Sequence, residues 1–346
     1  MDRRVFLMAG AGLPLLASCA SGIELRRDAS LQEFAKKLNV SAAAYAVLRA
    51  GQPVSTQAVA GAPDAIFQAA SLTKPVVAFA ALKMVQAGRL DLAAPVSHYL
   101  PDGYRHFHAP LRRSVHDSFD LVPAKTLERV TVAQLLNHSS GFPNWSGKPL
   151  AFISEPGQGW SYSGEGYVLL QAIMEAIART ELAAYLDQQV FTPLGMSDTS
   201  LVWRDAFDRR AVAGRMYLGL SRRARFQSGL AASTLYTTAS DYARFMSAFL
   251  TEDAMVQMAL ARPVEVSKPL GLEWGLGWGI ERGAEGIFIW QWGNNPGFRA
   301  FAMASTTSKD GFVVLTNSER GMSLAASIAQ EVLPLPHAAF RFPPVA

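Results

Sequence analysis

Four strand-like segments near the C-terminal end of the chain constrain its fold more than any other feature. Each segment is rich in apolar residues, and short turns containing glycine separate it from the next. A parallel connection needs a crossover of about a dozen residues or more, so strands joined this closely must be antiparallel neighbours. The segments span residues 274–281, 287–292, 298–304 and 312–316.

The N-terminal part of the chain predicts two more strands of the same sheet. Residues 42–49 are apolar, residues 54–60 alternate between polar and apolar, and a turn containing Gly51 and Pro53 separates them. The expected fold is therefore α+β, with an antiparallel β-sheet built from both ends of the chain.

Helical patterns fill the rest of the sequence. One helix over residues 31–38 precedes the first strand, and another over residues 322–332 follows the last. Residues from about 90 to 250 contain several helical segments broken by loops. We therefore expect N- and C-terminal helices to flank the sheet, an inserted, mostly helical subdomain over 90–250, and a single domain over 31–346.

Composition excludes several classes of protein. Half of the 346 residues are hydrophobic and 17% are charged, which is typical of a globular protein with a sizeable core. The formal net charge is only +4 and the basic residues are scattered, so a nucleic-acid partner is not expected. The sequence has no apolar run of the ~20 residues that a membrane-spanning helix needs.

The N-terminus has the features of an export signal. Arg3 and Arg4 precede an apolar stretch that ends in small residues, and Cys19 is the only cysteine. The arginine pair resembles a twin-arginine signal, and the residues ending in Cys19 resemble a bacterial lipobox. We expect residues 1–18 to be a signal peptide, Cys19 to be a lipid anchor and residues 19–30 to be a linker. The protein would then be an exported, membrane-anchored lipoprotein facing the periplasm or the cell surface.

The strongest chemical signal is Ser71-Leu72-Thr73-Lys74 at the start of a predicted helix. Residues three apart lie on one helix face, so the Ser71 hydroxyl can meet the Lys74 amine. Pro75 suits the first turn of that helix. Apolar neighbours can lower the pKa of a lysine until it acts as a base. Alone, this pattern also fits a helix-capping serine beside a surface lysine.

The wider sequence resembles the serine β-lactamase-like hydrolases, which include class C β-lactamases, D-amino-acid peptidases and related esterases. The likeness covers roughly residues 30 to 320 and implies a β-lactamase/transpeptidase-like fold. The motifs that carry it, in order, are Phe67 to Pro75, Gly88 to Leu92, Val132 to Gly141, Pro156-Gly157, Tyr162-Ser163-Gly164, Phe191 to Met196, Trp292-Gly293 and Pro296-Gly297-Phe298.

The resemblance implies a role for each matching residue. Ser71 would be the nucleophile, Lys74 its proton-handling partner, and Tyr162 an acid and base. Gln291-Trp292-Gly293 aligns with the third motif of the family. Backbone N–H groups of Ser71 and Asn294 would form the oxyanion hole. The implied reaction is hydrolysis of an ester or amide bond in a small molecule or peptide, through an acyl-enzyme and without a cofactor.

The sequence departs from the family pattern at two positions. Gly164 stands where the family usually has asparagine, and either Glu165 or Asn137 could supply the missing polar group. Gln291 replaces the basic or histidine residue that commonly recognises a substrate carboxylate, a role that Arg299 could take instead. Both changes weaken the case for β-lactam or D,D-peptide substrates. Several tryptophans either line an apolar cleft or belong to the core: Trp145, Trp160, Trp290 and Trp292.

Two other functions stay open from the sequence. The altered motifs also fit a binding or sensory lipoprotein that kept the penicillin-binding fold and lost turnover. Four histidines could bind a metal, although surface histidines are the interpretation we favour and no metal is expected: His98, His106, His108 and His116. The sequence does not determine the oligomeric state.

Overall fold

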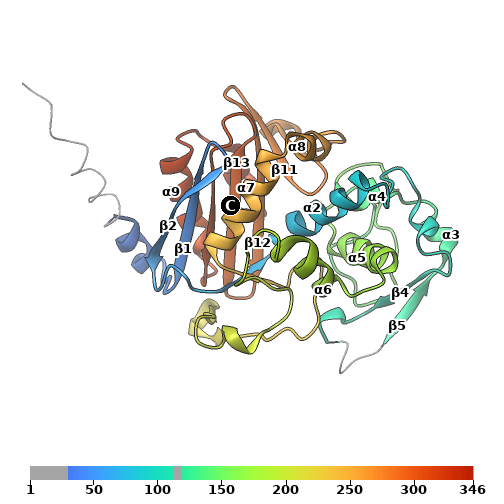
Figure 1. Ribbon diagram of the computed structural model, residues 1–346, viewed down its shortest axis with the longest axis horizontal. Coiled ribbons are helices and arrows are strands. Elements are labelled where there is room, and N and C mark those ends of the chain that lie inside the picture. The colour runs from blue at the N-terminus through green and yellow to red at the C-terminus, as the bar shows by residue number, and fades with distance from the viewer. Residues whose placement is uncertain (1–29, 113–117, 346) are drawn as a thin grey trace, which may run out of the picture.

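The computed structural model describes residues 30–112 and 118–345 (Figure 1). The predicted signal peptide of residues 1–18 and the predicted lipid anchor Cys19 lie outside the described residues. So does the predicted linker, except for its last residue, Ser30. Within the described part of the chain, no helix is both long and apolar enough to cross a membrane.

An eight-stranded antiparallel sheet forms the centre of the molecule. Its strands lie in the order β2-β1-β14-β13-β12-β11-β10-β9. Strand β1 pairs with β14, so the two ends of the chain meet inside one sheet and the predicted α+β fold is confirmed. The strands are β1 (Ala43–Arg49), β2 (Gln52–Ala60), β9 (Val264–Ser267), β10 (Leu272–Trp274), β11 (Gly279–Gly283), β12 (Gly286–Asn295), β13 (Phe298–Ser305) and β14 (Gly311–Thr316).

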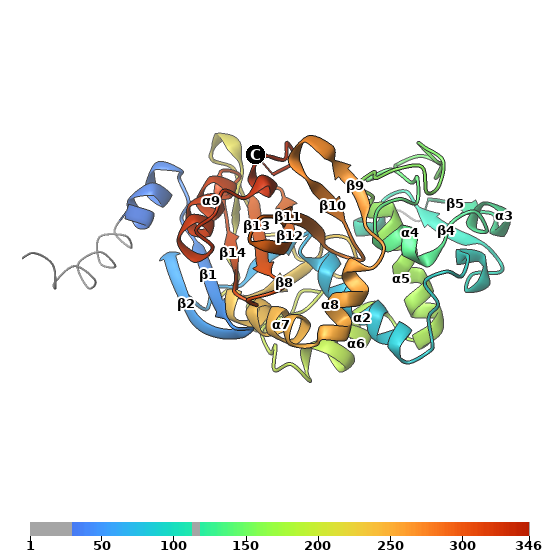
Figure 2. The same ribbon diagram turned by 90° about the horizontal axis from the view of Figure 1, so that it is seen from above.

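Both faces of the sheet are buried, which explains the continuous apolar character of its central strands. Side chains of β1 alternate between the faces: Ala44 and Ala46 join one core cluster, and Tyr45 and Val47 join the other. Helix α9 (Gly321–Val332) and the helical residues 30–37 cover the second cluster. Helix α7 (Ala239–Thr251) packs against the opposite face, on β1, β2 and β14 (Figure 2).

The prediction of one strand over residues 274–281 is wrong, because a tight turn divides it into β10 and β11. Gly277 adopts a φ of +99°, which a side chain would disfavour, and its N–H donates to Leu136 O at 3.2 Å. A Cβ on Gly275 would lie 2.1 Å from Ala259 O. The local alternation of apolar residues does not reveal these contacts with distant backbone.

The region between β2 and β9 contains the predicted helical part, together with three short strand pairs. Helix α7, towards the end of this region, packs on the main sheet rather than among the other helices of the region. The helices are α2 (Thr73–Gln86), α3 (Ala124–Leu127), α4 (Val132–Leu136), α5 (Gly164–Ala178), α6 (Leu182–Leu186) and α8 (Asp253–Leu260). The strand pairs are β3 (Phe67–Ala70) with β8 (Leu235–Thr237), β4 (Tyr104–Phe107) with β5 (Phe119–Val122), and β6 (Gly214–Arg215) with β7 (Ser221–Arg222). Short 3-10 or π turns are η1 (Val96–His98), η2 (Pro110–Arg112), η3 (Asp187–Phe191), η4 (Asp205–Phe207), η5 (Tyr217–Gly219), η6 (Lys268–Leu270) and η7 (Ala338–Arg341).

Candidate active site

Ser71 lies at the junction between strand β3 and helix α2. Strand β3 packs against β12 and β13, so the sheet holds this junction in place. Ala70, directly before the serine, has a φ of +51°, a left-handed conformation that is uncommon for alanine. Thr73 Oγ1 donates to Ala70 O at 2.6 Å and stabilises the sharp change of direction. The turn leaves Ser71 partly exposed, while the residues on either side are buried.

Lys74 is buried, with 1% of its surface exposed, and reaches back to the serine. Its Nζ lies 3.1 Å from Ser71 Oγ and donates to Ala232 O at 2.8 Å. Burial lowers the pKa of Lys74 to about 7. At neutral pH a large fraction of this amine is therefore unprotonated and able to accept a proton from Ser71.

Tyr162 lies on the other side of the lysine, just before helix α5. Its ring centroid is 4.7 Å from Lys74 Nζ, and its hydroxyl accepts a hydrogen bond from Gln291 Nε2 at 3.1 Å. Burial raises the pKa of Tyr162, although hydrogen bonding with Ser71 and Gln291 opposes that shift. The phenol therefore stays protonated over the neutral pH range and can donate a hydrogen bond.

The third motif runs along strand β12 beside this cluster. Gln291 is fully buried, and its amide also donates to Trp292 O at 2.9 Å. The Trp292 ring packs on Tyr162, with 4.7 Å between the centroids. A Cβ on Gly293 would lie 2.3 Å from Ala69 O, so glycine is what allows β12 to approach β3 this closely. Asn294, at the exposed end of β12, follows directly.

Three residues that could have replaced the missing polar groups of the family pattern form hydrogen bonds with other parts of the protein. Asn137 donates to Arg262 O at 3.1 Å and accepts from Ser139 Oγ at 2.7 Å. Glu165 accepts from Ser146 N at 2.8 Å and its other oxygen faces His106. Arg299 donates to the backbone carbonyls of Asn295 and Phe298. Because of these hydrogen bonds, neither the Asn137 nor the Glu165 side chain takes the position of the missing asparagine.

A neighbouring loop fills the space beside Gly164. Asn144 Oδ1 accepts from Gly164 N at 3.0 Å, and Asn144 O accepts from Glu165 N at 3.1 Å. A Cβ on Gly164 would lie 2.6 Å from Asn144 O and 3.1 Å from Trp145 Cζ2. The departure from the family pattern at this position therefore has a steric cause. Trp145 is 46% exposed, whereas Trp290 belongs to the core.

His138 is a residue of this site to which the sequence reasoning gave no role. It is fully buried with a φ of +58°, and its ring centroid lies 4.4 Å from that of Tyr162. Its Nδ1 accepts from Ser163 N at 3.1 Å. Burial and the nearby Lys74 hold the pKa of His138 well below its usual range. A neutral imidazole here packs under Tyr162 and adds no charge beside the lysine.

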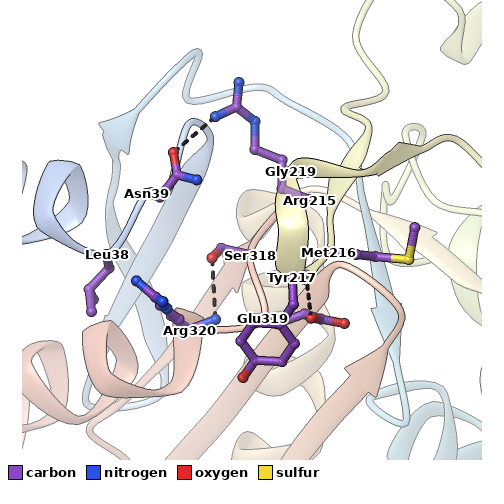
Figure 3. A pocket seen from close by; sticks show the side chains of 9 residues that line it. All are labelled: Leu38, Asn39, Arg215, Met216, Tyr217, Gly219, Ser318, Glu319 and Arg320. Carbon is purple, nitrogen blue, oxygen red and sulfur yellow. Dashed lines mark hydrogen bonds between the residues drawn. The ribbon is translucent and has the colours of Figure 1, made fainter.

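A separate cavity lies where residues 38–39 meet the β6–η5 segment and the residues just before α9 (Figure 3). Its volume is about 100 Å³, which holds only a few water molecules. Its polar groups bond to one another: Arg215 donates to Asn39 Oδ1 at 3.2 Å, and Tyr217 N donates to Glu319 Oε2 at 2.8 Å. It contains no nucleophile paired with a base, so the Ser71 cluster is the better candidate for catalysis.

Comparison with known proteins adds independent information. The sequence profile of the family described as Beta-lactamase matches residues 27–334. A penicillin-binding protein of Bacillus subtilis (strain 168) is 24% identical over 319 residues, which are 80% of this chain and 64% of that protein. Esterase EstB of Burkholderia gladioli is 29% identical over 224 residues, which are 53% of each protein. The chain therefore spans less than two thirds of the length of these two relatives.

The fold is also found among solved structures. A structure described as a class C beta-lactamase superposes with a TM-score of 0.73 at 19% sequence identity. The match covers 91% of this chain and 96% of that one.

Proposed function

Because this chain belongs to the beta-lactamase family, we propose that it is a serine hydrolase, and more specifically an esterase that forms an acyl-enzyme at Ser71. One observation carries the proposal: the buried Lys74 amine, whose pKa is lowered to about 7, lies 3.1 Å from the Ser71 hydroxyl. A neutral amine at that distance activates a serine as a nucleophile.

The reaction proceeds in two half-reactions. Ser71 Oγ attacks the ester carbonyl carbon while its proton passes to the neutral Lys74 amine. The tetrahedral intermediate expels the alcohol, which takes the proton back from Lys74, either directly or through the Tyr162 phenol. Water then attacks the acyl group in the same way and releases the carboxylic acid. The raised pKa of Tyr162 favours Lys74 as the base and the phenol as a proton donor.

Two features of the site favour esters over substrates that carry a carboxylate. Gln291 is neutral, and its amide hydrogen-bonds to Tyr162 inside the protein, so it supplies no cation for a carboxylate. The rim beside Gly164 is apolar, because Trp145 is there. Trp145 and residues 109–111 together line a hollow of about 200 Å³. An ester with an apolar acyl or alcohol group suits this surface.

Active-site labelling combined with substrate screening tests the proposal. A fluorophosphonate should add one probe mass to the protein, and the adduct should be lost in Ser71→Ala but kept in Ser327→Ala, a control on α9. Short-chain p-nitrophenyl esters should be hydrolysed faster than D-amino-acid amides or a chromogenic cephalosporin. Turnover should fall about 10⁴-fold or more in Ser71→Ala. Labelling of Ser71 without turnover of any substrate would instead support the binding or sensory protein.

A series of acyl chain lengths tests the role of the apolar rim. Trp145→Ala should lower kcat/KM for an octanoate ester about 10-fold, because it removes apolar contact with the long chain, and should leave the acetate ester nearly unchanged. Leu220→Ala, at another exposed apolar residue on a different loop, is the control. Equal losses for both esters in Trp145→Ala would argue against this substrate class.

Export as a lipoprotein is part of the same proposal, supported by Arg3-Arg4 and by Cys19 at the end of the apolar N-terminal stretch. In bacterial cells the wild type should fractionate with membranes, and its N-terminal peptide should carry an acylated Cys19. Cys19→Ala should move the protein to the soluble fraction. An identical distribution of the two proteins would contradict the anchor.

A further inference from the structure

A cluster of metal-ligating side chains lies on the hairpin formed by β4 and β5, which lies in the part of the molecule outside the main sheet (Figure 1). His106 and Asp120 are directly opposite each other in the antiparallel register. His108 is two residues after His106, so its side chain projects from the same face of the hairpin. The sequence therefore brings two imidazoles and one carboxylate together through strand geometry alone.

The donor atoms of these three side chains converge. His106 Nδ1 lies 2.7 Å from Asp120 Oδ1, and His108 Nε2 lies 3.0 Å from the same oxygen. All three ligand atoms lie within 4.8 Å of one another. Zinc bonds of about 2.0–2.1 Å place tetrahedral ligand atoms about 3.3 Å apart. To hold an ion, the two histidine–Asp120 distances would lengthen by about 0.3–0.6 Å, and the two ring nitrogens, which lie within 4.8 Å of each other, would settle about 3.3 Å apart.

The surroundings of the cluster hold its ligands in place. His106 is 1% exposed, and its other ring nitrogen, Nε2, lies 3.3 Å from Oε2 of the equally buried Glu165. Asp120 Oδ2 accepts a hydrogen bond from Leu150 N at 3.1 Å. A histidine that binds a metal commonly donates its second nitrogen to a carboxylate, which fixes the tautomer and the ring orientation. In this structure His106 Nε2 faces the Glu165 carboxylate without forming a hydrogen bond to it, and Nδ1 is left to face the ion.

Charge and access also suit a divalent cation. The carboxylates of Asp120 and Glu165 both lie next to the His106 imidazole, so a cation bound here would face two acidic side chains. The side chains of His108 and Asp120 are 24% and 20% exposed, so an ion can enter from solvent. Nitrogen and carboxylate ligands in this number are typical of zinc.

We propose that His106, His108 and Asp120 form a Zn²⁺ site, with a water molecule as the fourth ligand. The ion would fix the β4–β5 hairpin to the start of α5, because Glu165 joins His106 to the backbone of Ser146. Ser146 follows Trp145, so the site would also stabilise the loop that covers Gly164. The site is separate from the Ser71 cluster and does not depend on the esterase proposal.

Metal titration of the full chain tests the site. After treatment with a chelator and gel filtration, the protein should bind one equivalent of Zn²⁺ by calorimetry and unfold at a higher temperature with the ion than without it. His108→Ala, at the most exposed ligand, should weaken the affinity at least about 100-fold. Glu165→Gln should weaken it about 10–100-fold. His98→Ala, at an exposed histidine of η1, should match the wild type.

Cobalt spectroscopy supplies a readout that needs no variant. Co²⁺ added to the wild-type apoprotein should give the intense visible absorption of a four-coordinate ion, and Zn²⁺ should displace it. Only the weak absorption of octahedral Co²⁺, or the same Zn²⁺ affinity in His108→Ala as in His98→Ala, would overturn the proposal.

Discussion

At the scale of single residues, the most consequential feature is the burial of Lys74. A lysine three residues after a serine is common in proteins, and what distinguishes this one is that the surrounding core removes it from water. Its Nζ forms hydrogen bonds with Ser71 Oγ and Ala232 O. Desolvation therefore prepares the amine to act as a base.

The lowered pKa predicts the pH dependence of the reaction. Below a pKa of about 7 Lys74 is protonated and cannot accept the Ser71 proton, so kcat/KM should fall about tenfold for each pH unit. Above it the amine is neutral and kcat/KM should reach a plateau. The profile is measured between pH 5 and 9 by titrating the acid that is released from an uncharged ester. A value of kcat/KM that still rises tenfold per pH unit up to pH 9 would show that the site does not perturb the amine.

Restoring the family's asparagine at Gly164 should harm the protein. The new Cβ would press on Asn144 O, so Gly164→Asn should lower the free energy of unfolding by about 1–3 kcal/mol in urea and reduce esterase activity. Gly159→Asn is the matched control, because a Cβ at Gly159 meets no atom within 4 Å. Equal stability of the two variants would mean that the 144–145 loop moves aside at little cost.

At the scale of elements, the site depends on the contact between β12 and β3. Strand β12 carries Gln291 and Trp292, β3 leads into Ser71, and Gly293 is the point of closest approach. Nearby, Asn295 Nδ2 donates to Gln68 Oε1 and to Ser233 O. The bond between Asn295 and Gln68 therefore joins the two strands close to the glycine.

Separating these strands should displace the nucleophile. Gly293→Ala would place its Cβ 2.3 Å from Ala69 O, so we expect unfolding to become easier by about 1–3 kcal/mol and kcat/KM to fall more than tenfold. Gly283→Ala, on the adjacent strand β11, is the control. Its new Cβ would meet only Gly286 O, at 3.9 Å, so this variant should behave as the wild type. Wild-type kinetics in Gly293→Ala would show that the contact does not position Ser71.

At the scale of the whole molecule, the two ends of the chain form one body with the region between them. Asn317, just after β14, accepts from Ala42 N at 2.8 Å, and its amide donates to Ala213 O at 2.9 Å. One buried side chain thus joins the N-terminal strand, the C-terminal strand and the middle of the sequence.

Removing this connection should destabilise the entire fold. Asn317→Ala leaves a buried donor and a buried acceptor without partners, which should lower the free energy of unfolding by about 3 kcal/mol in urea. Gln227→Ala, at an exposed amide, should change it by less than about 0.5 kcal/mol. Similar values for the two variants would indicate that water replaces both bonds.

Local patterns in the sequence determined the antiparallel strands, the two flanking helices and the serine–lysine spacing. Strand alternation, turn residues and helix periodicity act over a few residues, so they can be read without the fold. The resemblance to the serine β-lactamase-like hydrolases, rather than these patterns, identified Gly164 and Gln291 as unusual. It did not reveal why those residues are there.

Tertiary structure alone decided the order of the eight strands, the division of residues 274–281 and the environment of Lys74. It also showed that Asn144 and Trp145 occupy the space beside Gly164, and that Asn137 bonds elsewhere. Each of these depends on contacts between segments far apart in the chain. Steric exclusion and desolvation depend on which atoms are packed against each other in the folded protein. A single sequence does not show which atoms these are.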